Sequence, residues 1–60
     1  IKPDPAIYTL ALDRLELEAE ECVFIDDREV NVNAARKLGI NGIVFQSKSQ
    51  TMRDVDNLLK

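Results

Sequence analysis

Apolar residues recur at helical spacing in three stretches of this chain, over residues 5–15, 30–38 and 51–59. A spacing of three or four residues places the apolar side chains on one face of a helix. Two short apolar runs, 22–25 and 42–45, lie between these stretches and predict buried strands. The positions that define the three helical stripes are Ile7, Ala11 and Leu15, then Val30, Ala34 and Leu38, then Met52, Val55, Leu58 and Leu59.

Residues at the ends of the helical stretches support these boundaries. Asp4 can accept hydrogen bonds from the first-turn amides of a helix beginning at Pro5, a position that needs no amide donor. Gly39 follows the second stripe and is typical of a helix end. Thr51, with Asp54 three residues later, has the spacing of a capping box and predicts the start of the last helix.

A strand, a helix and a second strand within about 24 residues form a βαβ unit, which implies two neighbouring parallel strands and a right-handed crossover. The predicted order is α-β-α-β-α, an α/β fold with part of a doubly wound parallel sheet. Parallel sheets are normally covered by helices on both faces, and two strands cannot complete one. Because the chain opens at Ile1 rather than Met, we expect further strands in a longer parent chain or in a partner.

Composition excludes several functional classes. The 60 residues carry 8 basic and 11 acidic side chains, a net charge of −3, and the basic ones form no patch for nucleic acid. A single cysteine, Cys22, and the absence of histidine exclude an internal disulfide and a zinc cluster. No apolar run has the roughly 18 residues of a membrane span. These features predict a cytoplasmic protein without a nucleic-acid or membrane role.

The adjacent acids Asp26 and Asp27 follow the first apolar run and are the strongest candidates for chemistry. Functional groups in open α/β sheets gather at the carboxyl ends of strands. Successive strand side chains point to opposite faces, so we expect one acid to face the crevice, where Mg²⁺ accepts carboxylate oxygens, and the other to hold a neighbouring group. An alternative is that an aspartate here only caps the following helix.

Several segments of the chain form a recognisable set in their order and spacing. They are Lys2-Pro3-Asp4-Pro5, Phe24-Ile25-Asp26-Asp27, Asn31, Ala34-Ala35, Leu38-Gly39 and Ile43-Val44-Phe45. Together they resemble the haloacid dehalogenase-like (HAD) hydrolase superfamily, over the chain from Lys2 to about Phe45. The Lys-Pro-Asp-Pro segment looks like the third motif of that family, and the acid pair at the strand end looks like its fourth.

The resemblance implies a role for each matching residue. Lys2 would be a catalytic residue that neutralises the nucleophile and the bound phosphoryl group, and Asp26 would hydrogen-bond and orient Lys2. Asp27 would be an acidic ligand to Mg²⁺, the implied cofactor. Asn31 stands where relatives often place a polar residue near the water shell of the metal.

The resemblance also implies an incomplete site. Family members transfer a phosphoryl group to an aspartate in an Asp-x-Asp motif, and water then hydrolyses the aspartyl-phosphate. That motif is absent from this sequence. Residues 1–60 are therefore expected to be the C-terminal part of a single HAD-like core domain, inactive alone, within a Mg²⁺-dependent phosphatase that acts on a small phosphorylated molecule.

Two other interpretations remain. A signalling receiver domain also carries an acid pair at a strand end, but it needs a phosphate-accepting aspartate after a later strand, and the strand ending at Phe45 supplies none. A non-catalytic interaction module, which self-associates through an exposed sheet edge, is the other alternative.

One departure from the family pattern concerns the end of the first helix. Relatives commonly place glycine there, whereas this chain has Leu15-Glu16-Leu17. The turn must therefore close without a residue that easily adopts the left-handed conformation. Farther along the chain, Tyr8, Phe24 and Phe45 are expected in the core.

Overall fold

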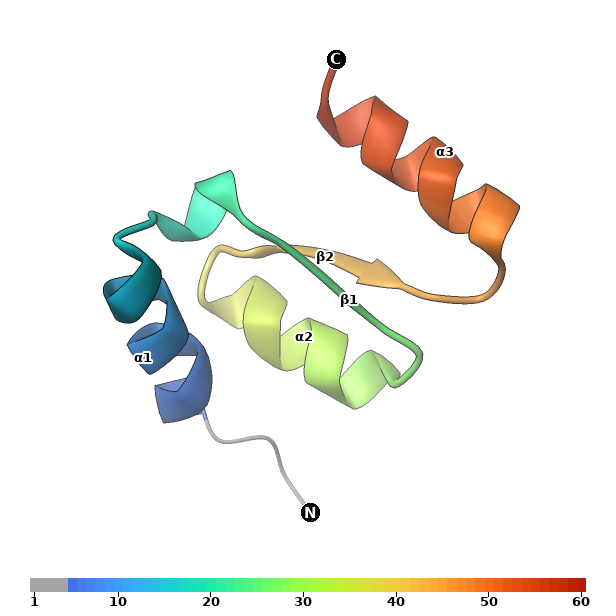
Figure 1. Cartoon of the computed structure of the whole chain (residues 1–60). Coiled ribbons are helices and arrows are strands. Elements are labelled where there is room, and N and C mark those ends of the chain that lie inside the picture. Colours follow the sequence, from blue (N-terminus) through green and yellow to red (C-terminus); the bar gives the residue numbers. More distant parts are fainter. Residues whose placement is uncertain (1–4) are drawn as a thin grey trace.

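A computed structural model of the chain describes residues 5–60, which fold into three α-helices, one 3₁₀ turn and two strands (Figure 1). Among these residues, no helix has the length and apolar character needed to cross a membrane. In chain order the elements are α1 (Pro5–Leu15), η1 (Ala19–Glu21), β1 (Val23–Asp26), α2 (Glu29–Lys37), β2 (Asn41–Val44) and α3 (Lys48–Leu58).

The two strands form a parallel pair with α2 as their crossover, which confirms the predicted βαβ unit. The register pairs Val23 with Asn41 and Asp26 with Val44. The side chain of Asn41 strengthens this start of the pairing, since its Nδ2 donates to the carbonyls of Glu20 at 3.0 Å and Cys22 at 3.1 Å. In Figure 1, α2 runs along the strand pair, and α1 and α3 lie at opposite ends of the molecule.

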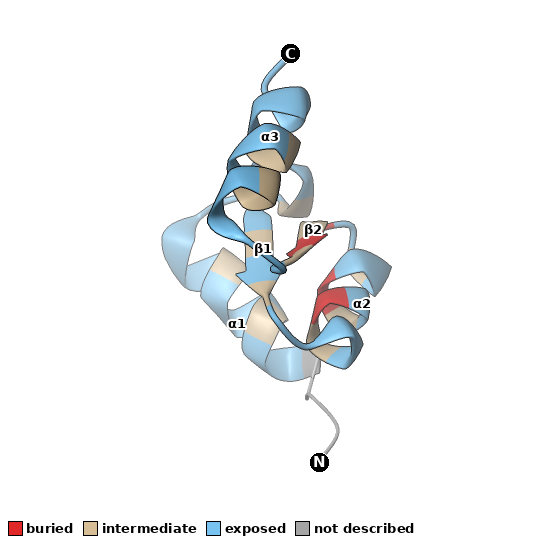
Figure 2. Ribbon diagram, turned by 90° about the vertical axis from the view of Figure 1, so that its right-hand side faces the viewer, coloured by how far each residue is buried: buried red, intermediate tan, exposed pale blue. Residues whose placement is uncertain are grey.

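The buried core is small and is made of residues of α2, of β2 and of the turn between them (Figure 2). On β1, by contrast, Val23 and Ile25 are 42% and 43% exposed. The prediction of a fully buried first strand is therefore wrong, because the described residues cover only the face of β1 that carries Phe24 and Asp26. The buried apolar residues are Val32, Ala35, Ile40 and Ile43.

The strand boundaries differ by one residue from those predicted. β1 begins after Cys22 and includes Asp26, and β2 ends before Phe45. Phe45 is 43% exposed, so its assignment to the core is wrong. Tyr8 and Phe24 are half-buried and meet edge to face, with ring centroids 5.2 Å apart and an interplanar angle of 86°.

The start of α3 is also different from the prediction. Its N-cap is Ser47, whose hydroxyl accepts from the Gln50 amide at 3.1 Å, while Gln50 Oε1 accepts from the Ser47 amide at 3.1 Å. This reciprocal pair is a capping box. Thr51 and Asp54 lie inside the helix, so the cap predicted there is wrong, because the same spacing occurs four residues earlier with a serine and a glutamine.

The turn after α1 uses a left-handed residue that is not glycine. Glu16 has φ of 56°, and the Leu17 amide donates to the carbonyl of Leu12 at 3.0 Å. An L-residue pays a steric cost in this conformation. By contrast, the turn after α2 uses Gly39, with φ of 88°, as predicted from its position.

Candidate functional site

The two acids lie at the carboxyl end of β1, as the sequence predicts. Asp26 is the last residue of the strand and is half-buried, whereas Asp27 begins the connection to α2 and is exposed. The two carboxylates therefore have different surroundings. One is positioned by the fold, and the other is open to solvent.

Asp26 is held by two donors from the start of α2. Its Oδ1 accepts from the Arg28 amide at 2.9 Å, and its Oδ2 accepts from Asn31 Nδ2 at 3.1 Å. The Arg28 amide and then the Asn31 side chain are the main causes that lower the pKa of Asp26, against the opposing effect of its partial burial. Asp26 is therefore ionised at neutral pH.

Asn31 connects this acid to the first helix. The Tyr8 hydroxyl of α1 donates to the backbone carbonyl of Asn31 at 3.3 Å, and the Tyr8 ring packs on Phe24 of β1. Asn31 of α2 is thus bonded both to Tyr8 of α1 and to Asp26 of β1. The sequence predicts Tyr8 only as a core residue, although an apolar ring with a polar tip is suited to this position at the border of the core.

Neither acid is the N-cap of α2. The N-cap residue is Arg28, and its side chain makes no cap hydrogen bond. The alternative that the acid pair serves only to cap this helix is therefore not supported. Asp26 still contributes to the local turn, because it accepts the Arg28 amide two residues ahead.

The predicted site residues can be placed in part. Asp26, Asp27 and Asn31 lie together, with the Asn31 side chain on Asp26, whereas Lys2 falls outside the described residues. Within residues 5–60, no three acidic, thiol or imidazole side chains cluster to hold a metal ion. The carboxylate oxygens of the acid pair are hard donors that suit Mg²⁺, but they supply only part of a coordination shell.

Removing the Asn31 amide should raise the pKa of Asp26. In Asn31→Ala, one of the two main donors to the ionised carboxylate is lost, so the carboxyl signal of Asp26 in a ¹³C NMR titration should move to higher pH. A depressed folded pKa adds stability above the unfolded pKa, and this stability is lost as pH falls through the folded value. The loss begins near the unfolded pKa in both proteins, so in the variant it should be smaller and should be complete at a higher pH.

Asn33→Ala is the matched control, because Asn33 lies on the same helix and contacts Arg36 rather than Asp26. An Asp26 titration that is identical in Asn31→Ala and in the unsubstituted protein would show that this hydrogen bond does not hold the carboxylate in solution.

Comparison with known families gives a consistent result. A family model described as haloacid dehalogenase-like hydrolase matches residues 1–39. The matched stretch includes the acid pair and Asn31, so the family match and the local geometry concern the same residues.

Curated relatives match nearly the whole chain. Flavin mononucleotide hydrolase 1 of Arabidopsis thaliana is 37% identical over 57 residues, which are 95% of this chain and 23% of that protein. Acyl-CoA dehydrogenase family member 10 of Mus musculus is 38% identical over 58 residues, 97% of this chain and 5% of that protein. Bifunctional epoxide hydrolase 2 of Sus scrofa is 37% identical over 57 residues, 95% of this chain and 10% of that protein. The chain thus spans less than a quarter of each of these relatives.

Proposed function

Because the chain belongs to the haloacid dehalogenase-like hydrolase family, we propose that it supplies the acid-pair half of the active site of a Mg²⁺-dependent phosphatase. The observation that carries this proposal is the arrangement of Asp26 and Asp27. A fixed, ionised carboxylate lies beside an exposed one at the carboxyl end of a parallel strand. This is the edge of an α/β sheet where ligands bind.

The acid pair divides two tasks in this proposal. Asp27 is open to solvent and supplies a carboxylate oxygen to Mg²⁺. Asp26 is already oriented by Arg28 and Asn31, and it retains acceptor capacity with which to orient the Lys2 ammonium. Lys2 in turn neutralises the phosphoryl group and the nucleophile. When bound, the metal ion offsets negative charge on the transferring phosphoryl group.

The nucleophilic aspartate is outside this sequence, so the proposed activity belongs to a protein that includes further strands of the core. Phosphate hydrolysis is preferred to dehalogenation because an acid pair suits cation binding, whereas expelling a halide needs no metal. The proposed substrate is a small phosphorylated molecule. Flavin mononucleotide belongs in any substrate panel, since one relative is named as its hydrolase.

Removal of divalent metal tests this proposal. The protein as the cell makes it should release phosphate from at least one of flavin mononucleotide, para-nitrophenyl phosphate and a sugar phosphate. EDTA should abolish this release, and excess Mg²⁺ should restore it. Lys2→Ala should lower kcat/KM by roughly 10²-fold or more, as expected for the loss of a group that stabilises transition-state charge.

Lys37→Ala is the control for charge, because Lys37 lies at the far end of α2 from the acid pair and is exposed. It should leave phosphate release unchanged. Phosphatase turnover that persists in EDTA, or that survives Lys2→Ala at full rate, would contradict the proposed mechanism.

A further inference from the structure

The outer edge of β2 has backbone groups that point away from β1. The Asn41 amide donates to the Cys22 carbonyl at 3.1 Å, and the Phe45 amide donates to the Asp26 carbonyl at 2.8 Å. In a parallel pair, alternate residues of a strand face the partner strand. The amides and carbonyls of the intervening residues, Gly42 and Val44, therefore face outward.

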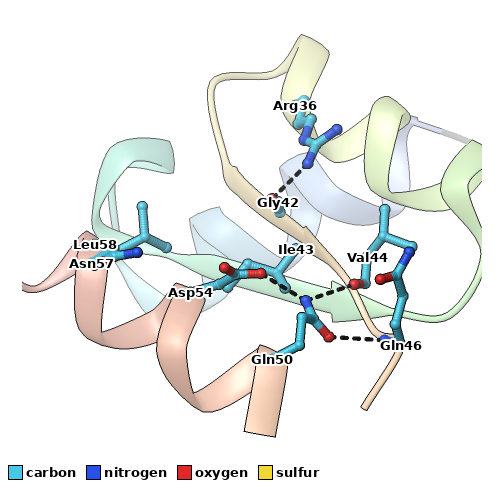
Figure 3. Close-up of a pocket in the computed structure, with 9 residues that line it drawn as sticks. All are labelled: Arg36, Gly42, Ile43, Val44, Gln46, Gln50, Asp54, Asn57 and Leu58. Atoms are coloured by element: carbon cyan, nitrogen blue, oxygen red, sulfur yellow. Dashed lines mark hydrogen bonds between the residues drawn. The ribbon is translucent and has the colours of Figure 1, made fainter. Parts of the chain in front are cut away.

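Two side chains from different helices cover the outward carbonyls. Arg36 Nη2 of α2 donates to the carbonyl of Gly42 at 2.9 Å, and Gln50 Nε2 of α3 donates to the carbonyl of Val44 at 3.1 Å. Figure 3 shows both bonds reaching β2 from opposite flanks. These carbonyls are the acceptors that an added strand would need.

Both covering side chains are themselves held in place. Arg36 Nη1 donates to Asn33 Oδ1 at 3.2 Å. Gln50 Nε2 also donates to Asp54 Oδ2 at 2.6 Å, and Gln50 Oε1 accepts from the Ser47 amide in the capping box. The two bonds to β2 are therefore part of the packing of α2 and α3 against the strand.

A hollow of about 420 Å³ lies along this edge and is lined by Arg36, Gln50 and residues 42–44. A strand added to β2 would have to enter this hollow and displace both side chains from the carbonyls. On β1, the outward residues are Val23 and Ile25, and no side chain among the described residues donates to their carbonyls. Among the described residues, side-chain donors thus cover the outer carbonyls of β2 but not those of β1.

We propose that Arg36 and Gln50 close the outer edge of β2 against strand addition. An unpaired edge is a template for association with another chain. With the two side chains removed, the partner expected at β2 is a second copy of this chain, pairing through the same edge. This inference concerns the sheet and does not depend on the proposed phosphatase activity.

The test is the double variant Arg36→Met/Gln50→Glu in the protein as the cell makes it. Methionine keeps the aliphatic stem at Arg36, and glutamate keeps the oxygen that accepts from Ser47, while both donors to β2 are lost. We expect sedimentation to shift to larger species as concentration rises. Amide hydrogen exchange at Gly42 and Val44 should slow at the same time. In the unsubstituted protein these two amides should exchange fast at every concentration.

The control is Lys37→Met/Ser49→Glu, which changes the charge equally at two exposed side chains that do not line the hollow. It should behave like the unsubstituted protein. Unchanged sedimentation of the double variant, association that leaves Gly42 and Val44 in fast exchange, or slow exchange of these amides in the unsubstituted protein would each overturn the proposal. If the double variant does not fold, Arg36→Met and Gln50→Glu are measured as single variants, and the same results support or overturn the proposal.

Discussion

Replacing Asp27 with asparagine is expected to lower kcat/KM for phosphate release by more than roughly 10²-fold, because losing even an outer partner of a metal ligand costs about 10–100-fold. Asparagine keeps the shape of the side chain but removes the negative charge that attracts Mg²⁺. Asp27 is exposed at the strand end, so the substitution should not disturb the fold. Turnover measured over a range of Mg²⁺ concentrations should show half-saturation at a much higher concentration.

Two comparisons give this result its meaning. Asp13→Asn removes the same charge from an exposed position on α1, and it should leave the Mg²⁺ dependence unchanged. Asp26→Asn removes the acid that is held by Arg28 and Asn31. It should lower turnover with a smaller change in the Mg²⁺ requirement, since its proposed partner is Lys2. An Asp27→Asn protein with normal turnover and a normal Mg²⁺ dependence would refute the assignment of Asp27 as a metal ligand.

The substitution Gly42→Ala is expected to destabilise the fold by about 1–3 kcal/mol, the usual cost of overpacking a core. A Cβ atom at Gly42 would lie 2.7 Å from Val32 Cγ1 and 2.9 Å from Arg36 Cγ. Val32 is fully buried, so its side chain cannot turn into solvent to relieve this contact. Arg36 can move only by giving up its bond to the Gly42 carbonyl. Urea unfolding should show a lower midpoint with an unchanged slope.

A double-mutant cycle separates the clash from other effects of the new methyl group. Val32→Ala removes the Cγ1 atom that the added Cβ would meet, at the cost of a small cavity. The combined variant Val32→Ala/Gly42→Ala should therefore be more stable than the sum of the two single changes predicts. Strict additivity would mean that the contact with Val32 is not the source of the destabilisation.

The general architecture follows from periodicity, whereas the burial of β1 and the start of α3 do not. Helical spacing and two apolar runs predict the βαβ unit, and the structure contains it. The sequence cannot show that one face of β1 is left open, because an apolar run is the same whether one or both faces are covered. The sequence does not single out the capping box at Ser47, because Thr51 offers the same pattern four residues later and only the end of β2 decides between them.

The candidate site is predictable in its acids and not in its supporting contacts. Asp26 and Asp27 are visible as an acid pair after an apolar run, and Asn31 follows from the family resemblance. The backbone amide of Arg28 also donates to Asp26. This contact cannot be predicted from the residue type, because every residue except proline has a backbone amide donor. The bond from Tyr8 to the Asn31 carbonyl spans 23 positions and depends on how α1 packs.

The side-chain bonds of Asn41 to the carbonyls of Glu20 and Cys22 have a consequence for strand alignment. Side chains alternate along a strand, so sliding β2 by one residue would exchange its two faces. Ile43 would turn toward α2. Gly42 would move away from Val32, although the backbone lies so close to Val32 there that only a residue without a side chain fits. Asn41 therefore fixes the register at the start of the two strands, and this register keeps Asp26 paired with Val44 at their carboxyl ends.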